Sequence, residues 1–236
     1  MGDSEIEIRV LTTADEMASV NTVFQQVWGS VTPVVETELL CAIAHSGGYV
    51  IGAYDSSNMV GASFGFLGRY EGSEALHSHV TGILPGVQHS GVGRTIKLHQ
   101  RDWAAERGIP WITWTFDPLV RRNAWFNIEV IEAHVAEYLE NFYGIMADSI
   151  NGSDESDRLL VAWPTDDSVV RPSAPAGAAT IHVATPDDIV KLRRTDPGAA
   201  DHWRARVRDE LGGALARGGV VTGFTRDGAY QVAVPD

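Results

Sequence analysis

A glycine-rich turn between a predicted strand and a predicted helix is the feature that most constrains how this chain can fold. The stretch LPGVQHSGVGRTIKLHQRDWAAERG, residues 84–108, leaves a strand, passes through small residues and continues as an amphipathic helix that ends at Gly108. Small residues allow a ligand to approach the backbone closely, and the unpaired N–H groups at a helix N-terminus attract anions. Residues 88–93 are therefore a candidate anion site, although a strand-to-helix turn that simply needs glycine explains them equally well.

Two common nucleotide-binding motifs do not fit this loop. The dinucleotide-binding fingerprint requires its third glycine where this sequence has Ile96. The phosphate-binding loop of many nucleotide hydrolases requires a Gly-Lys-Ser/Thr triplet, which the sequence lacks. An anion held at this loop is therefore recognised in a different way.

Hydrophobic periodicity predicts the order of the other elements. Alternating or β-branched runs predict strands at residues 6–10, 49–54, 59–67, 76–84, 111–116 and 158–163. Helical spacing predicts a helix that begins near residue 13 and further helices at residues 36–45, 90–107, 123–133 and 135–143. Together these elements indicate a mixed α/β or α+β fold with helices on both faces of a sheet.

The composition changes after residue 164, where proline, alanine and glycine become frequent. We expect residues 1–164 to form the main domain and residues 165–178 to form an exposed linker. Residues 179–236 are predicted to form a C-terminal extension of strands and helices that packs on the core. Within it, residues 191–208 gather six basic residues in an otherwise acidic chain. Arg204 and Arg208 are four positions apart and are predicted to line an exposed helix face and pair with Asp201.

The charge and cysteine content exclude several kinds of partner. The 236 residues include 18 Lys and Arg against 31 Asp and Glu, and the formal charge of −13 repels nucleic acid and anionic membranes. Cys41 is the single cysteine, so the chain can form neither an internal disulfide nor a zinc site built on cysteine pairs. The sequence also lacks a signal-peptide pattern and an apolar run long enough to span a bilayer. We therefore expect a cytoplasmic protein that binds neither nucleic acid nor membrane.

The order of elements and the loop sequence together resemble a known enzyme family. A strand that ends in Leu84-Pro85 leads into Gln-x-x-Gly-x-Gly at residues 88–93, and a helix, a strand at Trp111 and a helix that starts at Asn123 follow. This arrangement, over residues 6–163, resembles the GNAT N-acetyltransferase superfamily. Residues 114–119, 141–144 and 157–158, with Arg122-Asn123-Ala124, are similar to an uncharacterised GNAT-like branch. The resemblance implies a mixed, mainly antiparallel central sheet flanked by helices, and sheet-based homodimers are common among such proteins.

The resemblance also implies a ligand, acetyl-CoA or another acyl-CoA, and the residues that would hold it. The pyrophosphate would lie on backbone amides of the loop, and the pantetheine would run along residues 82–87 like an added strand. A free amide near Val87 would polarise the thioester carbonyl. Asn123 matches a family position that contacts coenzyme A, and Phe126 would pack on the pantetheine. The implied cofactor-binding residues are Leu84, Gly86, Val87, Gln88, His89, Ser90, Gly91, Val92, Gly93, Arg94, Asn123 and Phe126.

The catalytic residues are less clearly marked. In the family pattern a tyrosine in the helix after the fifth strand protonates the departing thiolate, but the matching residues 124–127 here are Ala-Trp-Phe-Asn. Tyr143, or Tyr138 in the same segment, is a candidate for this role.

Two histidines are candidates for the base that leaves the acceptor amine neutral. His77 and His79 lie two positions apart on the strand before the loop and so point to one face. Core histidines satisfied by hydrogen bonds explain them as well, and a His-x-His metal site lacks a third ligand, so no metal is expected. Asp117, at the end of the next strand, is placed for substrate contact, while Asp117-Pro118 is also an ordinary turn.

These residues predict an acyl-CoA-dependent N-acyltransferase that acts on a small amine metabolite. A non-catalytic acyl-CoA-binding or sensor protein of the same fold is the alternative that the missing tyrosine favours. A different thioester reaction at the same site, either decarboxylation or hydrolysis, is the third interpretation.

Overall fold

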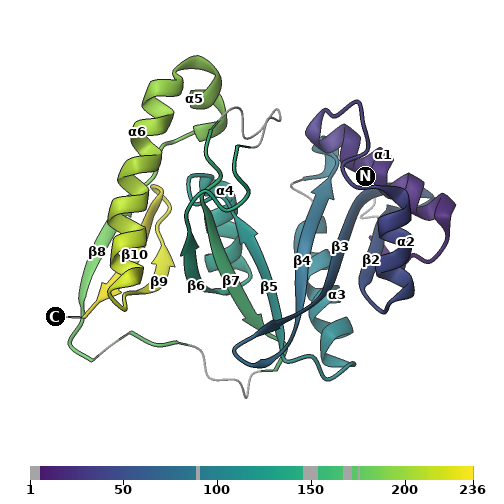
Figure 1. Ribbon diagram of the computed structural model, residues 1–236, viewed down its shortest axis with the longest axis horizontal. Helices are drawn as coiled ribbons and strands as arrows, with labels where there is room; N and C mark the ends of the chain where they lie inside the picture. Colours follow the sequence, from purple (N-terminus) through teal and green to yellow (C-terminus); the bar gives the residue numbers. More distant parts are fainter. Residues whose placement is uncertain (1–5, 89–90, 146–153, 167–171, 175, 236) are drawn as a thin grey trace. The chain divides into compact units, whose positions relative to one another are not determined.

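The computed structural model describes residues 6–88, 91–145, 154–166, 172–174 and 176–235. The chain divides into two compact units (Figure 1). Unit 1 consists of Met1–Thr113 with Pro164–Asp167, and unit 2 consists of Trp114–Trp163 with Ser168–Asp236. Strand β5 begins in unit 1 and ends in unit 2.

The sheet of unit 1 is antiparallel up to its last strand. Its strands are β1 (Glu7–Val10), β2 (Tyr49–Asp55), β3 (Asn58–Tyr70), β4 (Ser73–Ile83) and the first half of β5 (Trp111–Phe116). Neighbouring strands from β1 to β4 pair antiparallel, whereas Ala75 to His77 of β4 pair in parallel with Trp111 to Thr113 of β5. The full seven-stranded order is β1-β2-β3-β4-β5-β7-β6. The prediction of a mixed, mainly antiparallel sheet with flanking helices is confirmed.

Helices cover both faces of this sheet in unit 1. They are α1 (Ala14–Trp28), α2 (Thr37–His45) and α3 (Val92–Ala105). A capping box starts α1, because the Thr13 side chain accepts from the Glu16 amide and the Glu16 carboxylate accepts from the Thr13 amide. Strand alternation turns Val50 and Phe64 toward the core under α1 and α2, and it turns Tyr49 toward α3, where its hydroxyl bonds the His99 ring at 2.8 Å.

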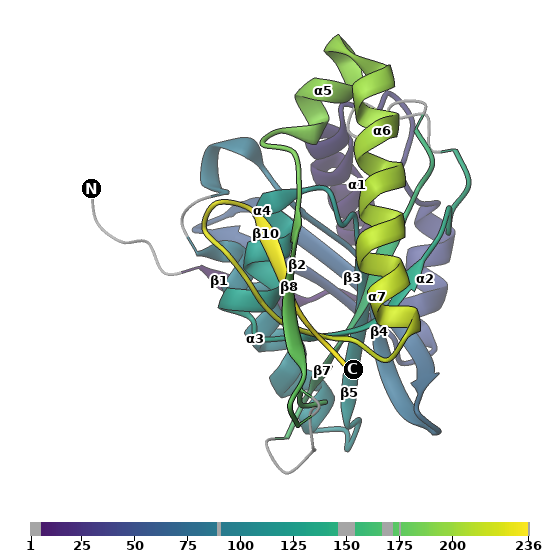
Figure 2. The same ribbon diagram turned by 90° about the vertical axis from the view of Figure 1, so that its left-hand side faces the viewer.

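Unit 2 contains the rest of the sheet and a second, smaller sheet. After β5 come α4 (Arg121–Trp125), a π-helical turn (Phe126–Val130), β6 (His134–Leu139) and β7 (Arg158–Pro164). The C-terminal elements are β8 (Ala179–Ala184), α5 (Ile189–Thr195), α6 (Pro197–Val207), α7 (Gly213–Ala216), β9 (Val220–Phe224) and β10 (Ala229–Val234). Strands β8, β10 and β9 form an antiparallel three-stranded sheet in that order. A π-helical turn (Arg208–Gly212) joins α6 to α7, so the two form one continuous rod (Figure 2).

The helix predicted at residues 135–143 is wrong, because this segment contains strand β6. His134 to Leu139 pair antiparallel with Arg158 to Ala162 of β7, with a bulge after Val135. The segment offers no sustained helical stripe: Val135 is buried, whereas its neighbours on the strand are half-buried or exposed. Pairing with β7, a partner distant in sequence, decides the conformation.

The C-terminal elements of unit 2 pack on residues 114–163. The Tyr230 hydroxyl donates to the Pro118 carbonyl at 2.7 Å, and the Phe224 amide donates to the Glu129 carboxylate at 2.6 Å. Arg193 of α5 reaches Asp117 at the end of β5, at 2.6 Å. In the described part of the chain, no helix is long and apolar enough to cross a membrane.

Candidate functional site

The glycine-rich turn of unit 1 has the geometry of a helix-terminal anion site. Strand β4 ends at Ile83, and a short 3-10 helix (Pro85–Val87) follows it. Gly91 then caps α3 in the left-handed conformation, with φ of 85°, which L-residues rarely adopt. A Cβ atom placed on Gly91 would have no atom within 4 Å, so the backbone faces open space. His89 and Ser90, which are predicted to be part of this site, lie outside the described residues.

The amides of the first turn of α3 are only partly engaged. The Arg94 and Thr95 amides donate to the Gly91 carbonyl at 2.9 and 3.1 Å. Val92 and Gly93 precede them, and the first N–H groups of a helix have no acceptor inside the helix. The positive end of the 14-residue α3 dipole adds to their attraction for an anion. The Arg94 amide is therefore a weaker candidate for anion binding than the amides of Val92 and Gly93.

The amide predicted to be free at Val87 is engaged instead. It donates to the Leu84 carbonyl at 3.0 Å and closes the 3-10 turn, and the Leu84 amide donates to the Val60 carbonyl at 2.9 Å. The expectation of a free amide donor near Val87 is corrected for Val87 itself, because the 3-10 turn uses its N–H group. Gly86 lies between them, and a Cβ atom placed there would have no atom within 4 Å, so this side of the turn is open. The Gln88 side chain donates to the Ile83 carbonyl at 3.2 Å and fastens the turn to the end of β4.

The two candidate histidines lie on one face of β4, next to a bulge. Phe64 pairs with Val80 and Gly65 with Ser78, which leaves His79 as the additional residue of β4. The His79 ring lies 5.4 Å from the Phe64 ring and 6.0 Å from the His77 ring, measured between centroids. His77 Nδ1 is 3.1 Å from the Thr113 hydroxyl.

Electrostatics favours the neutral form of both histidines. Burial, with smaller contributions from His79 and Lys97, lowers the pKa of His77 to about 4, and burial also lowers the pKa of His79. Both rings are therefore neutral near pH 7 and can accept a proton. Among the described residues, no group of three or more His, Cys, Asp or Glu is arranged to hold a metal ion.

A buried lysine lies on the opposite face of β4, under α3. Lys97 is 5% exposed, and its Nζ donates to the Ser78 hydroxyl at 3.0 Å. The Gln100 amide donates to the same hydroxyl at 2.9 Å and to the Ser63 hydroxyl at 3.1 Å. Burial lowers the pKa of Lys97 to about 7. The helical spacing of Ile96, Lys97, Gln100 and Trp103 is the sequence signal for the burial of Lys97.

Lys97 makes the stability of unit 1 depend on pH. The folded protein releases the Lys97 proton near pH 7, while the unfolded chain holds it up to a pKa near 10.5, so stability rises with pH between these values. Relative to wild type, Lys97→Met is expected to be more stable at pH 7, and this advantage should shrink by about 1.4 kcal/mol per pH unit from pH 7 to 9. Urea unfolding at pH 7, 8 and 9 measures it. The exposed Lys191→Met serves as a control, and parallel pH profiles of wild type and Lys97→Met would contradict a neutral Lys97.

Asp117 of unit 2 is buried in a structural ion pair. It is 6% exposed, one carboxylate oxygen accepts from the Leu119 amide at 2.9 Å, and the other accepts from Arg193 at 2.6 Å. Both carboxylate oxygens of Asp117 thus accept hydrogen bonds from other residues of the protein. We therefore correct the prediction that Asp117 contacts substrate and assign it to the turn after β5 and the anchoring of α5.

The two tyrosines that are candidates for the acid differ in their surroundings. The Tyr138 hydroxyl donates to Asp157 at 2.6 Å, and burial with this carboxylate raises its pKa far above the usual value, so Tyr138 is structural. Tyr143 is half exposed, its hydroxyl is 3.2 Å from that of Thr115, and the Arg158 guanidinium lies 5.5 Å from its ring. Tyr143 thus stays a candidate.

Asn123 and Phe126 lie on consecutive turns of unit 2. Asn123 is in the short helix α4, where its amide donates to the Val120 carbonyl at 2.9 Å, and both side chains are half-buried. Their assignment to coenzyme A stays a prediction.

A buried ionic network in unit 2 was missed by sequence reasoning. Asp154 accepts from Arg193 at 2.9 Å and from Arg204 at 2.6 Å, and all three are buried. Arg208 pairs with Asp157 at 2.6 Å. The prediction that Arg204 lines an exposed helix face is therefore wrong. Arg204 is buried against Asp154, which lies 50 residues away in sequence. No local pattern in the sequence indicates a contact of this range.

The fold matches solved acetyltransferase structures. A GNAT-family protein from Desulfovibrio desulfuricans is 16% identical, with 69% of this chain and 100% of that chain covered and a TM-score of 0.51. The yncA protein of Salmonella typhimurium, solved with its cofactor acetyl-CoA, is 14% identical, with 72% and 99% covered and a TM-score of 0.55. The ribosomal-protein-S5-alanine acetyltransferase of Vibrio fischeri is 13% identical, with 71% and 97% covered and a TM-score of 0.54. This chain has the GNAT fold.

The GNAT likeness is visible in structure and not in overall sequence. No protein-family model matches the chain, and no curated protein is significantly similar to it in sequence. The matched GNAT structures are covered almost completely, whereas about 70% of this chain is covered. The chain is therefore longer than the GNAT folds it matches.

Proposed function

We propose that the protein is an acyl-CoA-dependent N-acyltransferase that transfers an acetyl or related acyl group to the amine of a small metabolite. The observation that carries this proposal is Gly91, a left-handed N-cap with open space above it, at the start of a 14-residue helix that follows β4. The pyrophosphate of coenzyme A would accept from the amides of Val92 and Gly93 at the positive end of α3. The match to a GNAT structure solved with acetyl-CoA supports this ligand.

The pantetheine would lie along the last residues of β4. In the described residues, pairing of β4 with β5 covers Ala75 to His77, while β4 itself continues to Ile83. The backbone groups beyond His77 on that edge of β4 suit the amide groups of pantetheine, as in addition of a strand to a sheet. Leu84 and Gly86 would line the same path.

The chemistry requires little of the protein. The amine nitrogen attacks the thioester carbonyl, the new C–N bond forms, the C–S bond breaks, and coenzyme A leaves as a thiolate. The amine must lose a proton before or during attack, and a neutral His77 or His79 can accept it, directly or through water. Tyr143 is our proposal for the group that returns a proton to the thiolate. The acidic chain favours an acceptor that carries positive charge over nucleic acid.

Substitution of the histidines separates a base from a structural residue. His77→Ala and His79→Ala are each expected to lower turnover by about 10-fold to 100-fold if the residue accepts the proton, while coenzyme A affinity stays nearly unchanged. Because the pKa of His77 is about 4, its ionisation should not limit turnover above pH 6. The exposed His45→Ala is the control. Small and equal effects of all three variants on turnover would return both β4 histidines to a structural role.

The first test of the function is calorimetric titration with coenzyme A and acetyl-CoA. Micromolar affinity, about 8 kcal/mol of binding free energy, would justify a screen of amine acceptors. Tight binding without turnover on any amine would favour the non-catalytic binding protein. Release of coenzyme A without an amine would indicate hydrolysis or decarboxylation. No binding of either compound would mean that the glycine turn is structural.

A further inference from the structure

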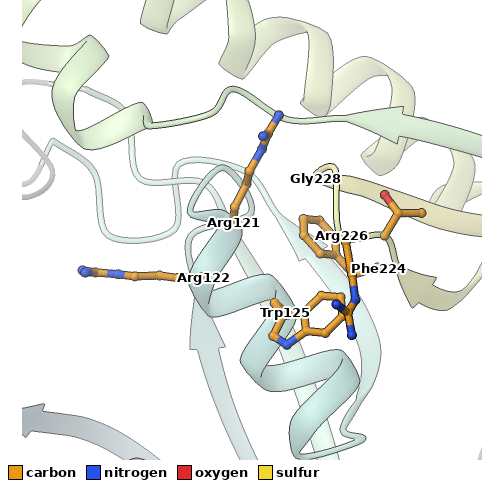
Figure 3. A pocket seen from close by; sticks show the side chains of 7 residues that line it. Arg121, Arg122, Trp125, Phe224, Arg226 and Gly228 are labelled. Atoms are coloured by element: carbon orange, nitrogen blue, oxygen red, sulfur yellow. The ribbon is translucent and has the colours of Figure 1, made fainter. Parts of the chain in front are cut away.

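Unit 2 contains a cavity of about 520 Å³ that none of the preceding chemistry uses. It lies between α4 and the turn from β9 to β10 (Figure 3). Three arginines, Arg121, Arg122 and Arg226, line it together with Trp125 and Phe224, and no acidic residue is in its lining. In a chain with a formal charge of −13, this concentration of positive charge without lining carboxylates is the unusual feature.

Arg121 forms a fixed wall of the cavity. Its guanidinium donates to the Thr185 hydroxyl at 3.1 Å, to the Thr185 carbonyl and to Asp187. Gly228, with φ of 91°, makes room for it, because a Cβ atom there would collide with the Arg121 side chain. Asp187 neutralises Arg121, so the charge available to a ligand comes from the other two arginines.

Arg122 and Arg226 carry that available charge. Both are exposed, and neither has an ion-pair partner among the residues that the structure describes. The Arg226 guanidinium lies 5.7 Å from the centre of the Trp125 ring and folds over it in Figure 3, while Arg122 extends away from them. The half-buried indole provides flat apolar surface beside the Arg226 charge.

We propose that this cavity, named here the Arg226 pocket, binds a small anion carried on a flat aromatic ring. The carboxylate or phosphate would pair with Arg226, and the ring would stack on Trp125. Arg122 would add long-range attraction and can turn toward the ligand because nothing described holds its head group. The pocket lies wholly within unit 2 and does not depend on the proposed acyltransferase function.

Two probes test the pocket by calorimetry on the full chain. Naphthalene-1-carboxylate represents a free aryl acid, and adenosine 3′,5′-bisphosphate represents the nucleotide end of coenzyme A. At least one probe is expected to bind. Arg226→Glu should weaken that binding by about tenfold or more, and Arg122→Glu should weaken it less. Arg194→Glu, an exposed charge reversal on α5 in the same unit, should leave it unchanged.

Further variants separate the outcomes. Arg226→Lys should retain part of the affinity for the probe, because it keeps the positive charge. The circular dichroism spectra of all variants should match that of the wild type. Nucleotide binding that Arg226→Glu weakens would identify a nucleotide as an occupant, and naphthoate binding that Arg226→Glu weakens would identify a free aryl acid. If neither probe is weakened by Arg226→Glu, the proposal is overturned; nucleotide binding that Gly91→Glu alone abolishes would then place the phosphate at α3. Failure of both probes to bind the folded wild-type chain would overturn it as well.

Discussion

Replacement of Gly91 with glutamate is expected to weaken coenzyme A binding by about 100-fold, or ~2.7 kcal/mol. The new carboxylate would stand at the N-terminus of α3, where the pyrophosphate should lie, and would compete for the same amides and the same dipole. Calorimetric titration with coenzyme A measures the loss. The fold should persist, because a side chain at this position enters open space.

Gly91→Gln is the matched control for this variant. Glutamine has nearly the same size and suffers the same backbone strain at φ of 85°, which costs on the order of 1–2 kcal/mol for any L-residue. The two variants should therefore unfold at similar urea concentrations but differ in coenzyme A affinity, with glutamine much the better binder. Equal affinities would mean that the α3 terminus does not hold the phosphates.

Asp154→Ala is expected to destabilise the protein by about 3–5 kcal/mol, the largest stability effect among these predictions. Asp154 is the shared partner of Arg193 and Arg204, and both guanidiniums are buried. Its removal leaves two buried positive charges with one fewer carboxylate between them. Among the described residues, only Arg193 keeps a second ion-pair partner, Asp117. Urea unfolding, followed by circular dichroism at pH 7, measures the change.

The control is an ion pair on the surface of the same unit. Arg206 and Glu210 are four positions apart, their side chains are 43% and 39% exposed, and their atoms approach to 2.8 Å. Glu210→Ala should cost about 0.3–0.5 kcal/mol, as exposed helical pairs do. A loss of similar size in Asp154→Ala would show that Asp154 does not neutralise the two arginines in the folded state.

Several elements could be predicted because their signals are local in the sequence. The Thr13 and Glu16 pair marks the start of α1, and Gly91 marks the start of α3, since capping and positive φ depend on residues a few positions apart. Alternation predicted β2 to β5 and the overall sheet class for the same reason. The loop that carries the proposed function is of this kind.

Other features depended on partners that no local pattern reveals. The segment with Val135 became a strand because β7 pairs with it, and Arg204 became buried because Asp154 lies beside it. The sequence places Asp117 for substrate contact, but Arg193, 76 residues away, pairs with its carboxylate. The sequence by itself determined the class of fold and the glycine-capped turn before α3, because short-range backbone rules govern them. Only the tertiary structure decided which charged side chains are buried and paired, because desolvation and ion pairing depend on neighbours brought together by folding.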